Sequence, residues 1–413
     1  MELTAHFAKT KLQAEGSLAH TAQADDLQIS FVIEGPTLAD VFPALGVPLP
    51  DTPPYRLTGE LGYDDEVWHL DDFDGRLGDS ALSGSASVDH SRDTPLLTAQ
   101  LRSSSLDFDD LAGLVGAPPD PDETASARQE ARAAEDGVFP DKPLSFERLN
   151  AMKMDVSFEG DNVRTRTVPL EKVRFHLQLS DGKARVDPLR FRLGGGEIEG
   201  VVRVDARQDR PTAVADFSID DIDLKPLFTD TRFVQQMGGR FLGHLFLKGS
   251  GRSLHEVLAD SHGSASLAMH DGSISGLMLE VIGLDVAEAL SLVVSDDARV
   301  AIRCGRADMD IEHGTGKLTR FLVDTTDTLL VATGSVDLAK EQFDIYLEAR
   351  EKDFSLIDAS APVHLHGSFD DVAFDIGDMD AFPLFNEGDQ KDISCTELLA
   401  DAIEHGQGEG RDE

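Results

Sequence analysis

The sequence has few aromatic residues and few positive charges, and each shortage counts against a class of function. Only 6% of the 413 residues are aromatic, with one tryptophan and three tyrosines. A polysaccharide-processing enzyme needs paired carboxylates in a cleft with an aromatic rim, so this class is the least favoured. The 77 acidic residues outnumber the 37 basic ones, giving a formal net charge of −40. Such a chain repels a polyanion, which excludes nucleic acid as a partner and favours solubility.

Long apolar runs are also missing. No stretch approaches the roughly 18 apolar residues of a membrane-spanning helix. The first residues, MELTAHFAKTKLQAEGSLAH, lack the apolar segment of a secretory signal peptide and already follow a strand pattern. A fragment that lacks its targeting segment would begin in this way.

Cysteine is scarce, with only Cys304 and Cys395 in the chain. Cys304 is in strand phase with Val300 and Ile302, as a small buried apolar residue would be. In an oxidising compartment the two cysteines can instead form a disulfide. Two cysteines leave both alternatives open.

No stretch of the sequence has the spacing of a known catalytic or metal-binding motif. The glycine-rich GGGEIEG lacks dinucleotide-loop spacing, and no helix follows it, so it predicts a hairpin turn. His364 and His366 share a strand face, as metal ligands can, but no third ligand lies nearby in the sequence. We therefore interpret them as a solvated histidine pair and predict no enzyme activity, no cofactor and no metal.

Strict alternation of apolar and polar residues is the dominant pattern. It recurs in LQISFVI (27–33), KVRFHLQLS (172–180) and QFDIYLEAR (342–350). Alternation with period two predicts sheets with one apolar and one polar face. We predict a mainly β fold: an elongated, curved antiparallel β-sheet groove, built from repeats, with short capping helices. The candidate groove residues are Leu27, Ile29, Phe31, Val173, Phe175, Leu177, Leu179, Phe217, Leu245, Leu267, Phe343, Ile345 and Leu347.

An internal repeat supports the elongated architecture. Residues 55–116 align without gaps with residues 171–232, at a constant offset of 116 positions. Val88-Asp89, for example, matches Val204-Asp205. Each copy predicts four strands followed by a short helix. Stacked copies would bury one another's apolar faces.

One short helix interrupts the strands after Gly251. Ser253 and Glu256 have the spacing of a capping box, and Leu254 and Leu258 share one face. We expect the helix to end at Gly263 and an alternating strand to follow.

These patterns divide the chain into five regions. They are a β-repeat region (1–116), an acidic, proline-rich excursion or linker (117–143), a second β-repeat region (144–250), a C-terminal β region (251–385), and a C-terminal helix with a frayed tail (386–413).

The segment from 251 to 276 resembles the AsmA family of bacterial envelope proteins. The motif places glycine at Gly251, Gly263, Gly272 and Gly276, and it includes Ser253, Leu254 and Leu258. The resemblance is best over 150–377 and fair over 1–116, and it makes 251–385 an AsmA-like C-terminal β region. Two departures are the missing N-terminal anchor and Val372, where the family usually has proline.

The resemblance implies a non-enzymatic periplasmic protein. In the full-length protein, an N-terminal helix would provide the anchor in the inner membrane, and the protein would contact the outer membrane. It implies that the β-groove supports outer-membrane biogenesis and conducts phospholipid, or another acyl-chain lipid, between the two membranes. The alternative from another class is a structural or adhesive β-solenoid with a closed core and no lipid ligand.

Overall fold

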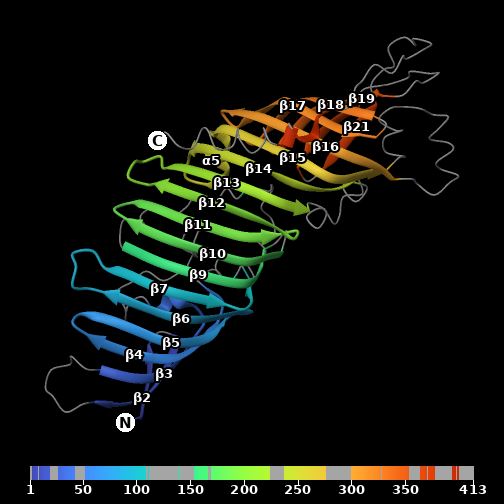
Figure 1. The fold of residues 1–413 in the computed structure, drawn as a ribbon. Helices are drawn as coiled ribbons and strands as arrows, with labels where there is room; N and C mark the ends of the chain where they lie inside the picture. Colours follow the sequence, from blue (N-terminus) through green and yellow to red (C-terminus); the bar gives the residue numbers. More distant parts are fainter. Residues whose placement is uncertain are drawn as a thin grey trace. The chain divides into compact units, whose positions relative to one another are not determined.

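The chain is mainly β in the computed structural model, as the alternation predicts (Figure 1). The structure describes residues 2–7, 9–18, 27–41, 52–107, 110, 139, 153–165, 169–223, 237–275, 299–326, 328–352, 363–369, 371–376, 393–396 and 398–399. Contacts divide the chain into two units. Unit 1 comprises residues 1–136, 141–192 and 200–213, and unit 2 comprises 137–140, 193–199 and 214–413.

Unit 1 is a run of strands with one 3-10 helix. Its elements are β1 (Glu2–Phe7), β2 (Thr10–Leu18), β3 (Leu27–Gly35), η1 (Leu38–Val41), β4 (Tyr55–Asp64), β5 (Val67–Leu77), β6 (Ser80–Asp89), β7 (Leu96–Ser103), β8 (Leu106–Asp107), β9 (Lys153–Arg164), β10 (Pro169–Ser180) and β11 (Lys183–Leu193). From β1 to β7 each strand pairs antiparallel with the next. β9 then joins β7 in parallel, and β10 and β11 continue the antiparallel order.

The parallel β7–β9 pair departs from a purely antiparallel prediction. Leu96 lies opposite Lys153, and the pairing continues to Ser103 opposite Gly160. Parallel neighbours need a long connection that returns the chain to the same end of the sheet. The residues between Asp107 and Lys153 supply that connection.

Strand β12 (Gly196–Asp205) has residues in both units, and most of β13 (Thr212–Asp223) belongs to unit 2. The further elements of unit 2 are β14 (Met237–Ser250), α5 (Leu254–Ala259), β15 (His262–Ser275), β16 (Arg299–Glu312), β17 (Thr315–Thr325), β18 (Thr328–Asp337), β19 (Gln342–Glu351), β20 (Val363–Ser368) and β21 (Val372–Ile376). From β14 to β21 each strand pairs antiparallel with its successor.

The 116-residue repeat recurs in the strand bounds. β5 and β11 begin and end 116 positions apart, as do β6 and β12. The turns repeat as well, because His90 N donates to Glu66 O at 3.0 Å and Ala206 N to Gly182 O at 2.8 Å. The short helices predicted after each copy fall outside the described residues.

The helix α5 begins as predicted and ends earlier. Ser253 is its N-cap, and its hydroxyl accepts from Glu256 N at 3.0 Å. Glu256 Oε2 accepts from Arg252 N, one residue before the position of an ideal capping box. The prediction that Gly263 ends the helix is wrong: Asp260 is the C-cap, and Gly263 lies inside β15.

The core of each unit lies on one face of a curved sheet. In unit 1 buried apolar residues gather around Phe31 and Phe73, and again around Phe158. In unit 2 a single cluster extends from Met269 to Val363. The 21 described strands belong to one sheet, and that sheet is open. Within the described residues, no helix has the length and apolar character needed to cross a membrane.

Candidate functional site

Apolar side chains form continuous rows across the strands of unit 1. The register places three rows side by side on one face of β6, β7, β9, β10 and β11. In strand order they are Gly84, Leu101, Phe158, Phe175 and Leu189; Ala86, Ala99, Val156, Leu177 and Val186; and Val88, Leu97, Met154, Leu179 and Ala184. Since neighbouring strands lie about 4.8 Å apart, each row extends about 19 Å across the sheet.

Over β6 and β7 the middle row carries only alanine side chains. Ala86 and Ala99 lie between Leu101 on one side and Val88 and Leu97 on the other. In β10, Phe175 stacks on Phe158 with ring centroids 5.1 Å apart. Phe175 and Leu177 are half-buried, so part of each side chain faces solvent. These strands therefore present a shallow apolar track.

The opposite face of unit 1 is polar and ion-paired. His176 Nε2 lies 2.8 Å from Asp155 Oδ1 across β10 and β9. Arg56 Nη1 donates to Glu34 Oε2 at 2.6 Å across β4 and β3. The two faces thus differ in chemistry on these strands, as alternation requires.

Unit 2 repeats this division of faces. One apolar row crosses β15 to β19 through Met269, Gly305, Val323, Leu330 and Ala349. Others follow β18 to β20 through Ala332, Leu347 and Val363, and through Gly334, Ile345 and Leu365.

The predicted groove residues of unit 1 lie where the alternation places them. Phe31 is buried opposite Ala14 and Gly59, and Ile29 lies opposite Gly16 and Leu61. Val173 lies opposite Gly160 in the ladder that also carries Phe175, Leu177 and Leu179. Leu27 pairs with Leu18 and Tyr63 through its backbone, and its side chain falls outside the described part of the structure.

The predicted groove residues of unit 2 also share one face. Asp216 pairs with His244 on the polar face of β13 and β14, so Phe217 and Leu245 point to the other side. Leu267 lies opposite Ala307, and Phe343 opposite Val336. Ile345 and Leu347 belong to the rows above.

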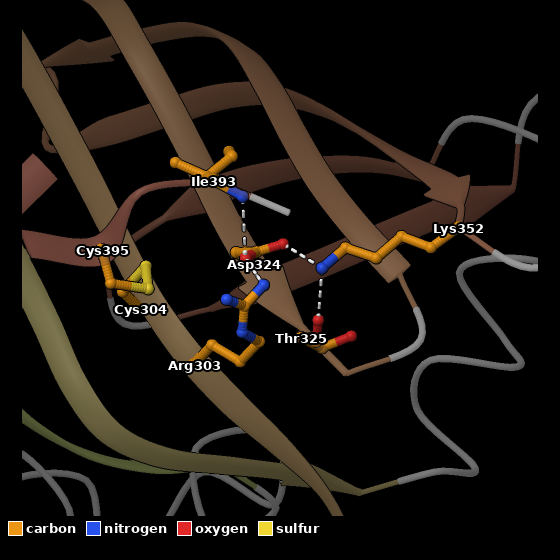
Figure 2. Close-up of a disulfide and its surroundings, with 7 residues drawn as sticks. All are labelled: Arg303, Cys304, Asp324, Thr325, Lys352, Ile393 and Cys395. Carbon is orange, nitrogen blue, oxygen red and sulfur yellow. Dashed lines mark hydrogen bonds and ion pairs between the residues drawn. A yellow bond between two sulfur atoms is a disulfide. The ribbon is translucent and has the colours of Figure 1, made fainter. Parts of the chain in front are cut away.

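The polar face of unit 2 carries the disulfide that the sequence left open, and a buried ion cluster that the sequence interpretation missed. Cys304 of β16 and Cys395 form a disulfide with their Cα atoms 5.7 Å apart. The disulfide lies beside a buried ion cluster centred on Asp324 (Figure 2). Ser394 O accepts from Leu398 N at 3.1 Å, so the C-terminal helical turn begins there.

Asp324 is fully buried and meets two cations. Arg303 Nη1 donates to its Oδ2 at 2.8 Å, and Lys352 Nζ lies 2.5 Å from its Oδ1. Oδ1 accepts no hydrogen bond of good geometry from the described residues, so the ammonium charge alone holds it. Ile393 N approaches Oδ2 at 3.4 Å, and Arg306 Nη1 donates to Leu398 O at 3.2 Å. The C-terminal segment thus covers buried charges of the sheet. The sequence contains one signal for the contact between the C-terminal segment and the sheet, which is that Cys304 and Cys395 have no other cysteine to pair with.

The motif residues organise one end of unit 2. A Cβ on Gly251 would lie 2.5 Å from Glu256 Cβ, and one on Gly272 would lie 2.8 Å from Gly238 O. Leu254 is 45% exposed, whereas Leu258 is half-buried. Gly276 lies outside the described residues. The end of α5 meets the β16–β17 turn, where Gly314 N donates to Ser261 O at 2.9 Å. The helix therefore covers an end of the sheet.

The comparisons with known proteins decide the family. The AsmA family model matches residues 1–321. The chain belongs to the AsmA family. The AsmA family protein YhjG of Escherichia coli strain K12 is 30% identical over 356 residues, which are 83% of this chain and 52% of that protein. The chain therefore spans about half the length of this relative. No solved structure matches the chain.

The AsmA family is associated with the bacterial envelope, and membership suggests an envelope-related function. AsmA proteins are generally not known as enzymes. The match begins at residue 1, so it includes the N-terminal repeat region as well as the motif around α5.

Proposed function

We propose that this AsmA-family chain binds the acyl chains of phospholipids along its apolar rows and conducts them between the inner and outer membranes. The observation that carries the proposal is the continuity of the apolar rows across an open sheet, in which half-buried residues such as Phe175 and Leu177 lie beside buried ones such as Phe158. A closed solenoid with a sealed core is not supported, because the sheet is open.

The energetics favour an acyl chain as the ligand. Each methylene that leaves water for an apolar surface contributes roughly 0.8 kcal/mol. Several methylenes along one row therefore supply useful affinity without a polar contact. The headgroup stays in solvent at the edge of the track, so no headgroup pocket is needed. A chain held only by apolar contacts can also slide, since no directional bond must break.

The proposed location is the periplasm, with the full-length protein anchored in the inner membrane and in contact with the outer membrane. An oxidising compartment agrees with the Cys304–Cys395 disulfide. The net charge of −40 discourages side-on adsorption to anionic membranes.

Photo-crosslinking in cells tests the proposal. Photoreactive residues at Phe175, Leu177, Phe343 and Ile345 should capture phospholipid. Matched residues on the polar face, at Arg174 and Glu348, should not. Lipid captured equally from both faces, or from neither, would refute the track. Native mass spectrometry of gently purified protein gives an independent measurement, with co-purifying phospholipid as the expected result.

A further inference from the structure

Two histidines and two aspartates converge on the polar face of β19, β20 and β21. We name Asp344, His364, His366 and Asp375 the histidine–aspartate cluster. The register places Asp344 opposite His366, and His364 opposite Asp375. His364 Nε2 lies 3.0 Å from Asp344 Oδ1, and His366 Nε2 lies 2.9 Å from Asp375 Oδ2. The two imidazole rings lie 4.6 Å apart between centroids.

This cluster differs from the other histidine–aspartate pairs of the molecule. Among the described residues, His176 with Asp155 and His244 with Asp216 each join one imidazole to one carboxylate. His270 places a single imidazole against two carboxylates, those of Asp271 and Asp221. Here one potential ligand atom each of His364, His366 and Asp375 lie within 4.8 Å of one another. Within the described residues only one other group has this compactness. It consists of Asp324 and the two disulfide-bonded cysteines, whose sulfurs cannot act as thiolate ligands.

We propose that the histidine–aspartate cluster binds a divalent cation of the zinc class. Imidazole nitrogen and carboxylate oxygen are both zinc ligands, and three protein ligands with a water in the fourth position complete tetrahedral coordination. His364, His366 and Asp375 supply the three. The sequence interpretation favoured a solvated histidine pair because no third ligand was close along the chain. Cross-strand pairing supplies the third, Asp375, while Asp344 pairs with His364.

The charge of the histidine–aspartate cluster and its exposure to solvent both favour binding of a cation. In the part of the chain that the structure describes, no lysine or arginine pairs with Asp344 or Asp375, so a dication would meet two carboxylates without a competing ammonium. The side chains of His364 and His366 are 25% and 37% exposed, and a hollow of about 400 Å³ borders Asp344 and His366. Tyr346 stacks on His364 with centroids 4.2 Å apart and holds the ring in place.

The geometry needs only small side-chain movements. The ligand atoms of His364, His366 and Asp375 now lie within 4.8 Å of one another. Around a zinc ion with bonds of about 2.0–2.2 Å, they would have to lie closer together than this. The cluster lies on the surface, where rotation of χ angles can close that difference without moving the strands.

Calorimetric titration of the chelator-treated chain with ZnCl2 tests the site. We expect one zinc ion per chain in the unaltered protein. His366→Ala should weaken binding at least about 10-fold, and the double variant His364→Ala with His366→Ala should abolish it. His176→Ala and His244→Ala are matched controls that remove a histidine paired with one aspartate, and they should keep full affinity.

Cobalt(II) absorption gives a direct measurement of coordination. The unaltered protein and the controls should develop visible bands of tetrahedral cobalt, and the His366→Ala variant should not. Equal heats in all proteins, or no visible bands in any, would overturn the proposal. Circular dichroism of each variant separates loss of the site from loss of the fold.

Discussion

Glycines inside the strands let neighbouring backbones approach closely. Gly263 has a φ of +154°, and a Cβ there would lie 2.0 Å from Phe246 O on β14. Gly84 is similar, with a φ of +146° and Gln100 O at 1.9 Å. Any larger residue must displace the partner strand as well as adopt a strained backbone. These positions therefore depend on glycine for a steric reason that alternation does not reveal.

Replacing Gly263 should destabilise unit 2. We expect Gly263→Ala to lower the free energy of unfolding by about 2 kcal/mol or more, because backbone strain adds to the overlap with Phe246 O. Gly238→Ala in the same β14–β15 ladder is the control, since its Cβ would meet only Ser273 Oγ at 3.8 Å. Urea unfolding measures both variants. If both variants lose a similar free energy of unfolding, the close approach of Gly263 to Phe246 O is not the cause of the destabilisation.

Equivalent aspartates of the two repeats are held ionised by their turns. Hydrogen bonds from Arg207 lower the pKa of Asp205 from 3.8 to about 2. Hydrogen bonds from Ser91 and then Arg92 lower the pKa of Asp89 to about 2. A lowered carboxyl pKa stabilises the fold above the ordinary pKa, near 3.9, and this contribution disappears as the pH falls through about 2.

Removing the guanidinium of Arg207 should raise the pKa of its partner Asp205 and of no other carboxyl group. In Arg207→Ala we expect the pKa of Asp205 to rise from about 2 toward 3.8, while that of Asp89 stays at about 2. Titration of the carboxyl carbon signals by NMR measures both values. A pKa of Asp205 that does not change would contradict the assigned cause.

At the scale of elements, the two faces of unit 2 are stabilised by different interactions. The apolar face depends on burial of residues such as Ile302 and Val323. The polar face depends on the disulfide and on the ion cluster of Asp324, which the C-terminal segment covers. A buried carboxylate with two cations tolerates loss of its partners poorly, because the remaining charges stay desolvated.

Asp324→Ala should therefore destabilise the fold far more than a matched substitution on the surface. We expect it to lower the free energy of unfolding by about 3–5 kcal/mol, since Arg303 and Lys352 lose their counter-charge. Asp337→Ala is the control: Asp337 pairs with Lys340 at 2.6 Å, but the lysine is 70% exposed, so about 1 kcal/mol or less is expected. Denaturant titration separates the two, and equal losses would contradict a special role for the buried cluster.

At the scale of the whole molecule, the proposed function depends on the uninterrupted apolar rows. One charged side chain in a row should hinder an acyl chain more than the same charge on the polar face, because the lipid must then desolvate it. Leu177 and Gln178 are neighbours on β10 that point to opposite faces, which makes them a matched pair.

Leu177→Arg should reduce the phospholipid that co-purifies with the protein at least several-fold. Gln178→Arg should leave it unchanged. Native mass spectrometry measures the bound lipid, and circular dichroism verifies that both variants fold. If both variants retain the same amount of lipid, acyl chains do not follow this row.

The sequence by itself determined the periodic features of this protein. Alternation revealed the strands and their two faces, the 116-residue repeat predicted matching strand bounds, and the Ser253 cap located the start of α5. Each of these is encoded by residues close together in the chain or by direct internal similarity. The end of α5 was mispredicted because Gly263 is needed for close strand packing rather than for terminating a helix.

Only the tertiary structure decided which distant residues meet. The register between strands aligns Ala99, Val156 and Leu177 into one row. It also brings Asp344 and Asp375 to the histidines of β20, while the disulfide brings the C-terminal segment to Asp324. Such contacts depend on long-range pairing, and a shift of one residue would move every side chain to the other face. Periodicity therefore encodes the two faces, and long-range pairing assembles the sites on them.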